Sequence, residues 1–387
     1  MPEKKQKKSA VLLDGNDLTN RPKENELEIS IFGPGYGECV LLHIGRNNWI
    51  VVDSCVFPGD NYPTPLLYLD KMNINYNAVK AIIATHWHDD HIKGISNIFS
   101  ACKNAEFICS DALKNQEFLE LVETYGNCVI AEDSGVKEFH EILKVMIERS
   151  EKDKINYTPK FAVADRHIWK SIFKDNNGDN ITTNLYSLSP SDAAILSAKL
   201  EIMKCLPVQN EHPRSIPAIS PNHASVALWL SFNDINILLG SDLEEKGNPN
   251  KGWSVIINSK TRPNGKAILY KVAHHGSINA YHPKIWEKML TDNPIAILTP
   301  FSKGKKLPTI EGIQKICSKT SNAFITGNPF SKKKFKRHHL VEKTLKETTG
   351  KIKMITPSYG HVRIRIKSKN KYSIELFGNA TTLCNIK

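Results

Sequence analysis

Three histidines and two aspartates occur within six consecutive residues, HWHDDH at positions 86–91. Imidazole nitrogens and carboxylate oxygens together suit Zn²⁺, Mn²⁺ or Fe, whereas Mg²⁺ and Ca²⁺ prefer sites made of oxygen alone. Because His86 and His88 are one residue apart, both side chains can reach one ion from an extended loop, and Asp90 and His91 can turn toward a second. Such residues also gather harmlessly on surfaces. Here the group follows an apolar run, where burial without a ligand would cost desolvation free energy, so the pattern indicates metal binding.

Two later segments offer further ligands. The run INILLG ends in Ser241-Asp242, and AILYKVA ends in HHGS at positions 274–277. Two ions about 3.5 to 4 Å apart need a shared oxygen ligand, and Asp242 is the natural candidate for this bridge. A pair of such ions lowers the pKa of a bridging water toward about 7, which gives a hydroxide that attacks an ester, amide or phosphorus centre. The residues therefore predict a hydrolase with two divalent ions, with Zn first and Mn or Fe as alternatives.

Short apolar runs, typical of β-strands, must position these side chains. Residues 27–32, 39–44 and 49–52 predict three strands separated by glycine-rich and Arg-Asn-Asn turns. Residues 78–85 form a nearly continuous apolar run, as in a strand buried on both faces. The segments ASVALWLSF and INILLG predict a hairpin-like pair, and AILYKVA a further strand. Three separate strands are thus expected to deliver His or Asp at their carboxyl ends.

The organisation of the chain follows from composition along its length. Residues 1–26 are polar and charged and predict a basic flexible tail. Residues 27–387 are expected to form one hydrolase domain. Within it, residues of about 100–153 show helical periodicity and predict a helical insertion, and residues 300–387 predict a second αβ half that closes the sheet.

Composition limits the class of protein and its partners. The formal charge of +12 slightly favours an anionic substrate or partner, although surface lysine also serves solubility. The eight cysteines include no C-x-x-C pair, so we expect them to be reduced and mostly buried. No apolar segment reaches the roughly 20 residues of a membrane span, and no secretory signal is present. We therefore expect a cytoplasmic protein without a membrane partner; the oligomeric state is not predicted.

The motifs resemble a known family. The segments THWHDDH, LLGSD and AHHGS are similar to the metal-binding signatures of metallo-β-lactamase fold hydrolases. In their order, together with GPGYGECVLLHIG, WIVVDS and NHASVALWL, they resemble the hydrolase domain of bacterial competence DNA-uptake channel proteins, here over about residues 27–300 and without a membrane part. The resemblance implies an α+β fold, the αββα sandwich, with the helical segment as an inserted lobe.

The resemblance also implies metal ligands. His86 and His88 would bind one ion, Asp90 and His91 the other, and Asp242 would bridge them. One of two adjacent histidines would complete the second site. We favour His274 as this ligand and expect His275, with Ser277, to contact substrate oxygens beside the catalytic Asp90.

Three further residues are weaker candidates. His223 stands where the first ion would find its third histidine, and the alternative is a loop histidine in solvent. Asp53 closes a strand and would accept an imidazole N–H from beneath the histidine loop, or would simply cap the strand end. Lys93 would touch a substrate phosphate, or point to water.

The substrate class is less defined, because the fold hosts β-lactam, thioester, lactone and phosphodiester hydrolysis. The resemblance and the positive charge favour a phosphodiesterase or nuclease. The basic run at 332–337 is expected to contact a nucleic-acid backbone through Lys332, Lys333, Lys334 and Lys336, with Phe335 interleaved. The alternatives are a hydrolase of a non-nucleotide ester, lactone or lactam, or a metal-containing partner-binding component of a defence or uptake system.

Overall fold

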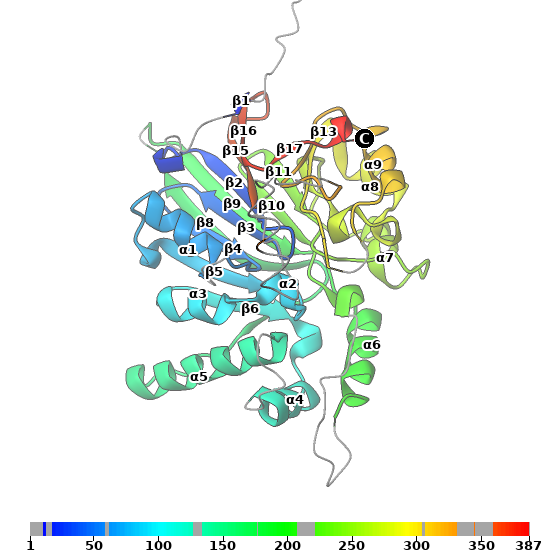
Figure 1. Ribbon diagram of the computed structural model, residues 1–387. Helices are drawn as coiled ribbons and strands as arrows, with labels where there is room; N and C mark the ends of the chain where they lie inside the picture. The colour runs from blue at the N-terminus through cyan, green and yellow to red at the C-terminus, as the bar shows by residue number, and fades with distance from the viewer. Residues whose placement is uncertain are drawn as a thin grey trace, which may run out of the picture.

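Two β-sheets packed face to face form the centre of the protein, and helices cover their outer sides (Figure 1). The computed structural model describes residues 11–12, 18–58, 62–126, 134–175, 177–206, 221–303, 306–330, 344 and 359–386. The first sheet contains, in spatial order, β1 (Val11–Leu12), β16 (Lys371–Gly378), β15 (Gly360–Ser368), β2 (Leu27–Gly33), β3 (Cys39–Ile44), β4 (Trp49–Val52), β5 (Val79–Ala84), β6 (Glu106–Ser110) and β7 (Lys160–Ala162). The second contains β17 (Thr381–Thr382), β14 (Ala323–Ile325), β13 (Leu290–Leu298), β12 (Ala267–Lys271), β11 (Ile235–Leu239), β10 (Leu228–Phe232), β9 (Asn180–Ser187) and β8 (Arg166–Lys174).

Helices complete four layers. The first sheet is covered by α1 (Thr64–Lys71), α3 (Ile95–Ala101), α4 (Gln116–Gly126) and α5 (Gly135–Asp153). The second is covered by α7 (Gly252–Asn258), α8 (Pro283–Lys288) and α9 (Ile310–Cys317). Two more helices, α2 (Asp89–Ile92) and α6 (Asp192–Met203), lie near the carboxyl end of β5. This arrangement confirms the α+β, αββα fold expected from the sequence.

Alternating side chains on the strands explain why the layers form. In β3, Val40 and Leu42 join the core between the two sheets, whereas Leu41 joins the core under the helices. In β11, Ile237 faces the core between the sheets and Leu238 faces the outer helices. Because successive side chains point to opposite faces of a strand, strands that are apolar throughout must be covered on both sides. Burying each such aliphatic side chain stabilises the fold by about 1.5–3 kcal/mol.

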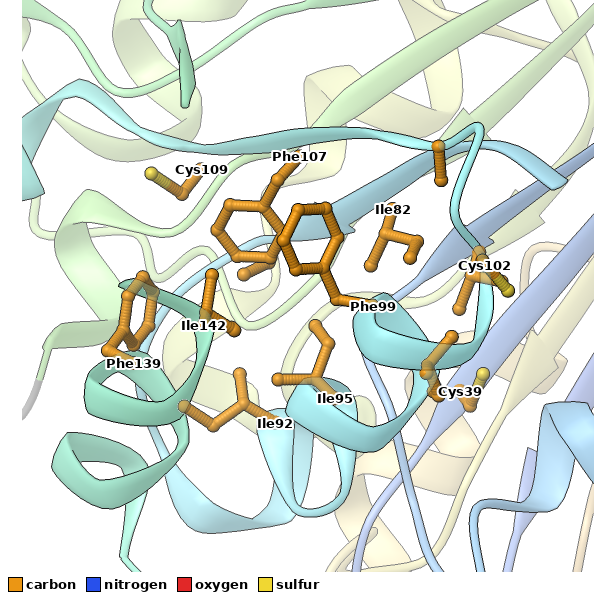
Figure 2. Packing of buried hydrophobic residues seen from close by; sticks show 14 of the residues in the cluster. Cys39, Ile82, Ile92, Ile95, Phe99, Cys102, Phe107, Cys109, Phe139 and Ile142 are labelled. Carbon is orange, nitrogen blue, oxygen red and sulfur yellow. The ribbon is translucent and has the colours of Figure 1, made fainter. Parts of the chain in front are cut away.

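The core under the helices is aromatic around α3 and α5 (Figure 2). The Phe99 and Phe107 rings lie with their centroids 5.5 Å apart, and Phe107 is 6.0 Å from Phe139 of α5. Ile142, one turn further along α5, packs in the same group. The helical segment expected at about 100–153 is therefore α4 and α5, docked on the first sheet after β6, with α5 packed against α3.

Strand direction brings the candidate ligands together. In the first sheet β4, β5 and β6 are parallel, and in the second β11, β12 and β13 are parallel. The carboxyl ends of parallel strands share one edge of a sheet. The two edges meet where Val226 N–H donates to the Thr85 carbonyl (3.0 Å) and Ser241 Oγ donates to Thr85 Oγ1 (2.7 Å). The hairpin expected from ASVALWLSF and INILLG is confirmed as the antiparallel pair β10–β11.

Both ends of the chain differ from the simplest expectation. Within the segment expected as a tail, Arg21 donates to the carbonyl of Met72 (2.7 Å) and Leu18 packs on the core. The segment 300–387 contributes to both sheets, since β14 and β17 extend the second and β15 and β16 extend the first. The basic run at 332–337 lies outside the described residues. In the part of the chain that is described, no helix is both long and apolar enough to cross a membrane.

The expectation that all cysteines are reduced is wrong for one pair. Cys317, the last residue of α9, forms a disulfide with Cys384, 67 residues further along, in the 3₁₀ turn Leu383–Asn385. That turn packs against α9, a proximity that sequence spacing cannot reveal. Five other described cysteines are free and buried, as expected: Cys39, Cys55, Cys102, Cys109 and Cys205.

Candidate metal centre

The HWHDDH loop is held in place on both sides. Trp87 is buried and meets Phe118 of α4 edge to face, with ring centroids 6.0 Å apart. The Asp89 carboxylate accepts the N–H of Gly135 (2.9 Å), the first residue of α5. At the end of α2, Gly94 has φ 84°, a conformation that favours glycine, and its N–H donates to Glu138 (2.6 Å). These contacts fix the backbone that carries the histidines.

Asp53, at the end of β4, holds the loop from below. Its Oδ1 accepts the Thr85 N–H (2.8 Å), and its Oδ2 accepts the Thr85 hydroxyl (2.7 Å). Oδ2 also lies 2.7 Å from His91 Nδ1. A carboxylate can only accept from a neutral imidazole, so it keeps the proton of His91 on Nδ1 and leaves the Nε2 lone pair for a ligand. This is the contact expected for Asp53 from the sequence.

His91, Asp242, Asp90 and His275 face one another at the meeting edges of the sheets. His91 Nε2 lies 3.3 Å from Asp242 Oδ1 and 3.8 Å from Asp90 Oδ2. His275 Nε2 lies 3.3 Å from Asp90 Oδ2 and 3.6 Å from Asp242 Oδ2. The loops after β5, β11 and β12 thus bring two carboxylates and two imidazoles together. The sequence predicted that three separate strands would each supply His or Asp at their carboxyl ends.

The atoms of this group fit a metal. The buried polar atoms without a hydrogen-bond partner among the described residues include Nε2 of His86, His91 and His275, and Oδ1 of Asp242. Buried polar atoms left unpaired are costly. Ligand atoms of Glu38, His91, Asp242 and His275 lie within 4.8 Å of one another, as do those of Asp53, His86 and His91. Mixed imidazole and carboxylate donors of this kind suit a divalent transition metal.

The charged side chains around this group also favour a bound cation. Four buried carboxylates, those of Glu38, Asp53, Asp90 and Asp242, surround the group, and Lys271 supplies one buried ammonium. Burial acts to raise the pKa of Asp242, but the neighbouring histidines outweigh it and hold this pKa well below its usual range. Burial acts to lower the pKa of His91, but the carboxylates, Asp242 first, raise it well above its ordinary value. With the imidazoles neutral, as ligands must be, four carboxylates face one ammonium, and a cation would neutralise the remaining negative charge.

Glu38 and Lys271 are the residues that sequence reasoning missed. Lys271, the last residue of β12, donates to Glu38 Oε1 and to the carbonyl of Ser241 (3.3 Å). The other oxygen of Glu38 accepts the Thr299 hydroxyl (2.6 Å). Glu38 lies 3.7 Å from both His91 and His275. The sequence offered one indication of Glu38, which stands between a glycine-rich turn and the apolar strand CVLLHI. A carboxylate buried at such a position is costly unless a charged or hydrogen-bonding group pairs with it.

The geometry separates the two adjacent histidines. Both have left-handed backbones, with φ of 46° at His274 and 52° at His275, a conformation that costs free energy in residues other than glycine. His275 is buried within the ligand group, and its Nδ1 lies 3.0 Å from the Thr299 hydroxyl. The side chain of His274 is 16% exposed and contacts Asn222 (3.3 Å) and Asn279 (3.1 Å), with Asp242 at 3.8 Å. The structure thus places His275 in the cluster and His274 at its rim, the reverse of the expected roles.

The other candidates lie around the cluster. The ring of His88 is half-buried, with its centroid 5.1 Å from that of His86. His223 is buried, with Nε2 3.9 Å from the Glu201 carboxylate of α6.

Two polar residues occupy the ends of the ligand loops. Lys93 is half-buried at the end of α2. Ser277 is half-buried after the histidine pair, and its N–H donates to the His274 carbonyl (2.8 Å). Both stay predictions as substrate-contacting residues.

Comparison with known proteins identifies part of the chain. Residues 32–159 match the model of the metallo-beta-lactamase superfamily, a stretch that contains Glu38, Asp53 and the HWHDDH loop. No curated protein matches the chain significantly.

Similar solved structures include a HARLDQ-motif mutant of a metallo-beta-lactamase from Cronobacter sakazakii, at 13% identity and a TM-score of 0.30, over 57% of this chain and 64% of that one. The metallo-beta-lactamase fold protein YhfI from Bacillus subtilis is 12% identical, with a TM-score of 0.29, over 63% and 70% of the two chains. The short form of human tRNase Z is 11% identical, with a TM-score of 0.28, over 63% and 76%.

The matched residues carry part of the candidate site. The matched residues supply the first sheet's strand ends and the HWHDDH loop, and the second sheet adds Asp242 and His275 to the same buried cluster. Residues 32–159 therefore resemble the metallo-beta-lactamase superfamily, and they lie within a two-sheet α+β architecture that brings the candidate ligands together.

Proposed function

We propose that the protein is a metal-dependent phosphodiesterase or nuclease. The observation that supports the hydrolase most strongly is the convergence of unpaired, buried Nε2 and Oδ1 atoms from the ends of three strands. The formal charge of +12 favours an anionic substrate over a neutral ester, lactone or lactam.

The proposed ligand set combines the distances around His91 and His275 with the sequence expectation for His86 and His88. His86 and His88 would hold one ion, Asp90, His91 and His275 the second, and Asp242 would be shared by both. When bound, two divalent ions supply a water of lowered pKa and stabilise negative charge on the oxygens of the reacting phosphorus. Zn²⁺ fits this mixed imidazole and carboxylate set, and Mn²⁺ or Fe²⁺ would fit the same donors.

The chain's own residues would then orient the reactants. Asp90 Oδ2, already 3.3 Å from His275 Nε2, would accept the proton of the attacking water. His274 faces the rim, where its imidazole, supported by Asn279, would contact a substrate oxygen. Asp53 and Glu38 would keep His91 and His275 in place through the contacts described above.

The test is turnover of bis(p-nitrophenyl) phosphate by the full chain purified without chelator and supplied with Zn²⁺ or Mn²⁺. Wild-type protein should release p-nitrophenolate, and Asp90→Asn should lose activity while keeping its far-UV circular dichroism. Asp89→Asn is the matched control, because its carboxylate accepts Gly135 N–H and not a ligand histidine.

Other outcomes distinguish the alternatives. Hydrolysis of a chromogenic lactam or a lactone without any phosphodiester turnover would overturn the proposed substrate class. Metal binding without turnover of any of these substrates would favour the partner-binding alternative.

A further inference from the structure

Beside the metal centre, two aromatic rings and a lysine from separate loops form a continuous rim. Tyr36 lies in the loop after β2, and Phe301 and Lys303 follow β13. The Phe301 ring centroid lies 5.4 Å from that of His275, and the Tyr36 ring centroid lies 5.7 Å from that of Phe301. Lys303 Nζ donates to the Tyr36 hydroxyl (3.2 Å) and lies 4.7 Å from the centre of its ring. The rim therefore begins at a candidate metal ligand and runs outward.

The backbone holds these rings in place. Ser302 N–H donates to the carbonyl of Gly35 (2.9 Å), which ties the two loops together. Glu38 N–H donates to the carbonyl of Asp90 (2.9 Å). Gly37 has φ 101°, and a Cβ there would approach the Asp90 carbonyl to 3.2 Å, so the Tyr36 loop packs closely on the loop of catalytic Asp90. Besides burial, the charges of Asp90 and Asp89 raise the pKa of Tyr36, which places its hydroxyl within their field.

The side chains of this rim are accessible from solvent to different degrees. Tyr36 and Phe301 are half-buried, and Lys303 is exposed. Each ring thus keeps part of its surface accessible next to the catalytic groups. The lysine adds positive charge where the cluster itself is negative.

We infer that Tyr36, Phe301 and Lys303 form a nucleoside-binding subsite, in which the base adjoining the scissile phosphodiester stacks on the two rings and Lys303 pairs with phosphate oxygens. Aromatic side chains bind bases of any sequence through their faces, and a nearby lysine neutralises the backbone. This inference rests on the proposed phosphodiesterase function and names its substrate class: an ester with a nucleobase, rather than any alkyl phosphodiester.

Two probes with the same leaving group isolate the base. Thymidine 5′-(p-nitrophenyl phosphate) carries a base, and methyl p-nitrophenyl phosphate does not. Tyr36→Leu and Phe301→Leu should each raise KM for the thymidine ester about 5- to 150-fold, the fold-change equivalent of losing one stacked base. KM for the methyl ester should change less than about twofold, because this ester has no base to stack on the rings. Tyr36→Phe should restore the wild-type KM by restoring the ring.

The role of Lys303 is tested separately, through the dependence of KM on salt concentration. Lys303→Gln should weaken the dependence of KM on salt for both esters, because salt screens the lysine–phosphate attraction that this substitution removes. Lys288→Gln, an exposed lysine at the end of α8, is the matched control and should leave the salt dependence unchanged.

The results that overturn the inference differ from those that overturn the function. If the leucine variants fold, retain metal, and change KM for both esters equally, the base does not bind on these rings. If wild-type protein with metal hydrolyses neither ester, the proposed function fails and this inference fails with it.

Discussion

Replacing Asp53 by asparagine should weaken metal binding without removing any metal ligand of the proposed set. Asp53 accepts from Thr85 through both oxygens and meets His91 Nδ1 at 2.7 Å. Asparagine keeps one oxygen for the Thr85 N–H but turns an NH₂ group toward His91 Nδ1. Nδ1 must then accept, so the proton of His91 moves to Nε2. Nε2 lies 3.3 Å from Asp242 Oδ1, and its proton would point at the carboxylate that should share the ions.

The expected magnitude follows from this contact. Loss of a carboxylate that orients a ligand histidine typically lowers metal affinity 10- to 100-fold, or about 1.4 to 2.7 kcal/mol. Asp53 is 2% exposed, so water cannot replace the lost acceptor. The assay is competition for Zn²⁺ with a chromophoric chelator, with thermal unfolding of the metal-free protein recorded in parallel to measure the separate cost to the fold.

Asp165→Asn is the matched control. Like Asp53 (φ 59°), Asp165 has a left-handed backbone (φ 56°). It accepts the hydroxyls of Ser259 and Thr261 (2.7 Å for the latter), but no ligand histidine contacts it among the described residues. It should lose some stability and no zinc affinity. A folded Asp53→Asn protein that binds zinc within about twofold of wild type would refute the tautomer argument.

Three further predictions concern the stability of the fold. Lys271→Met should destabilise the metal-free protein by about 3–5 kcal/mol in urea unfolding, because it leaves the Glu38 carboxylate buried without its ammonium partner. The Glu38→Gln/Lys271→Met double variant should lose less stability. An equal or larger loss in the double variant would contradict the proposed energetic coupling of Glu38 and Lys271. Burial lowers the pKa of His43 to about 4, so the unfolded chain binds a proton on this side chain near pH 6.5 and the folded chain only near pH 4. The free energy of unfolding should therefore fall as the pH drops through this window, and His43→Gln should remove up to about 3 kcal/mol of that loss. A His43→Gln protein with the pH profile of wild type would contradict this role of His43. The Cys317–Cys384 disulfide links two positions 67 residues apart in the chain. Its reduction should lower the free energy of unfolding by up to about 4 kcal/mol, because the unfolded chain gains conformational freedom. A double Cys→Ser variant as stable as the oxidised protein would contradict this contribution.

The sequence was most informative where residues able to bind metal directly follow an apolar run typical of a β-strand. The apolar run before His86 predicted a buried strand, and β5 is such a strand, with the buried His86 two residues after its end. Asp242 and the histidine pair were placed correctly at the ends of β11 and β12 for the same reason. Local periodicity predicts a strand and its faces, and residue type predicts its chemistry.

What the sequence could not predict depends on contacts between distant segments. In β15 the polar His361, Arg363 and Arg365 alternate with apolar residues and yet are buried, because the strand pairs with β2 and β16 inside the first sheet. Glu38 and Lys271 are 233 residues apart and meet only after the two sheets pack. The roles of His274 and His275 depend on left-handed backbones that direct one ring inward, and neighbouring residues of the same type carry no signal for that choice.

Metal stoichiometry in two variants tests the central claim most directly. Protein purified without chelator should contain close to two transition-metal ions per chain by elemental analysis. Asp242→Ala should retain fewer than one, because the shared carboxylate is lost, and His275→Ala should lose more metal than His274→Ala, because only His275 lies within the buried cluster. A folded wild-type chain without bound transition metal, or equal loss from the two histidine variants, would contradict the account.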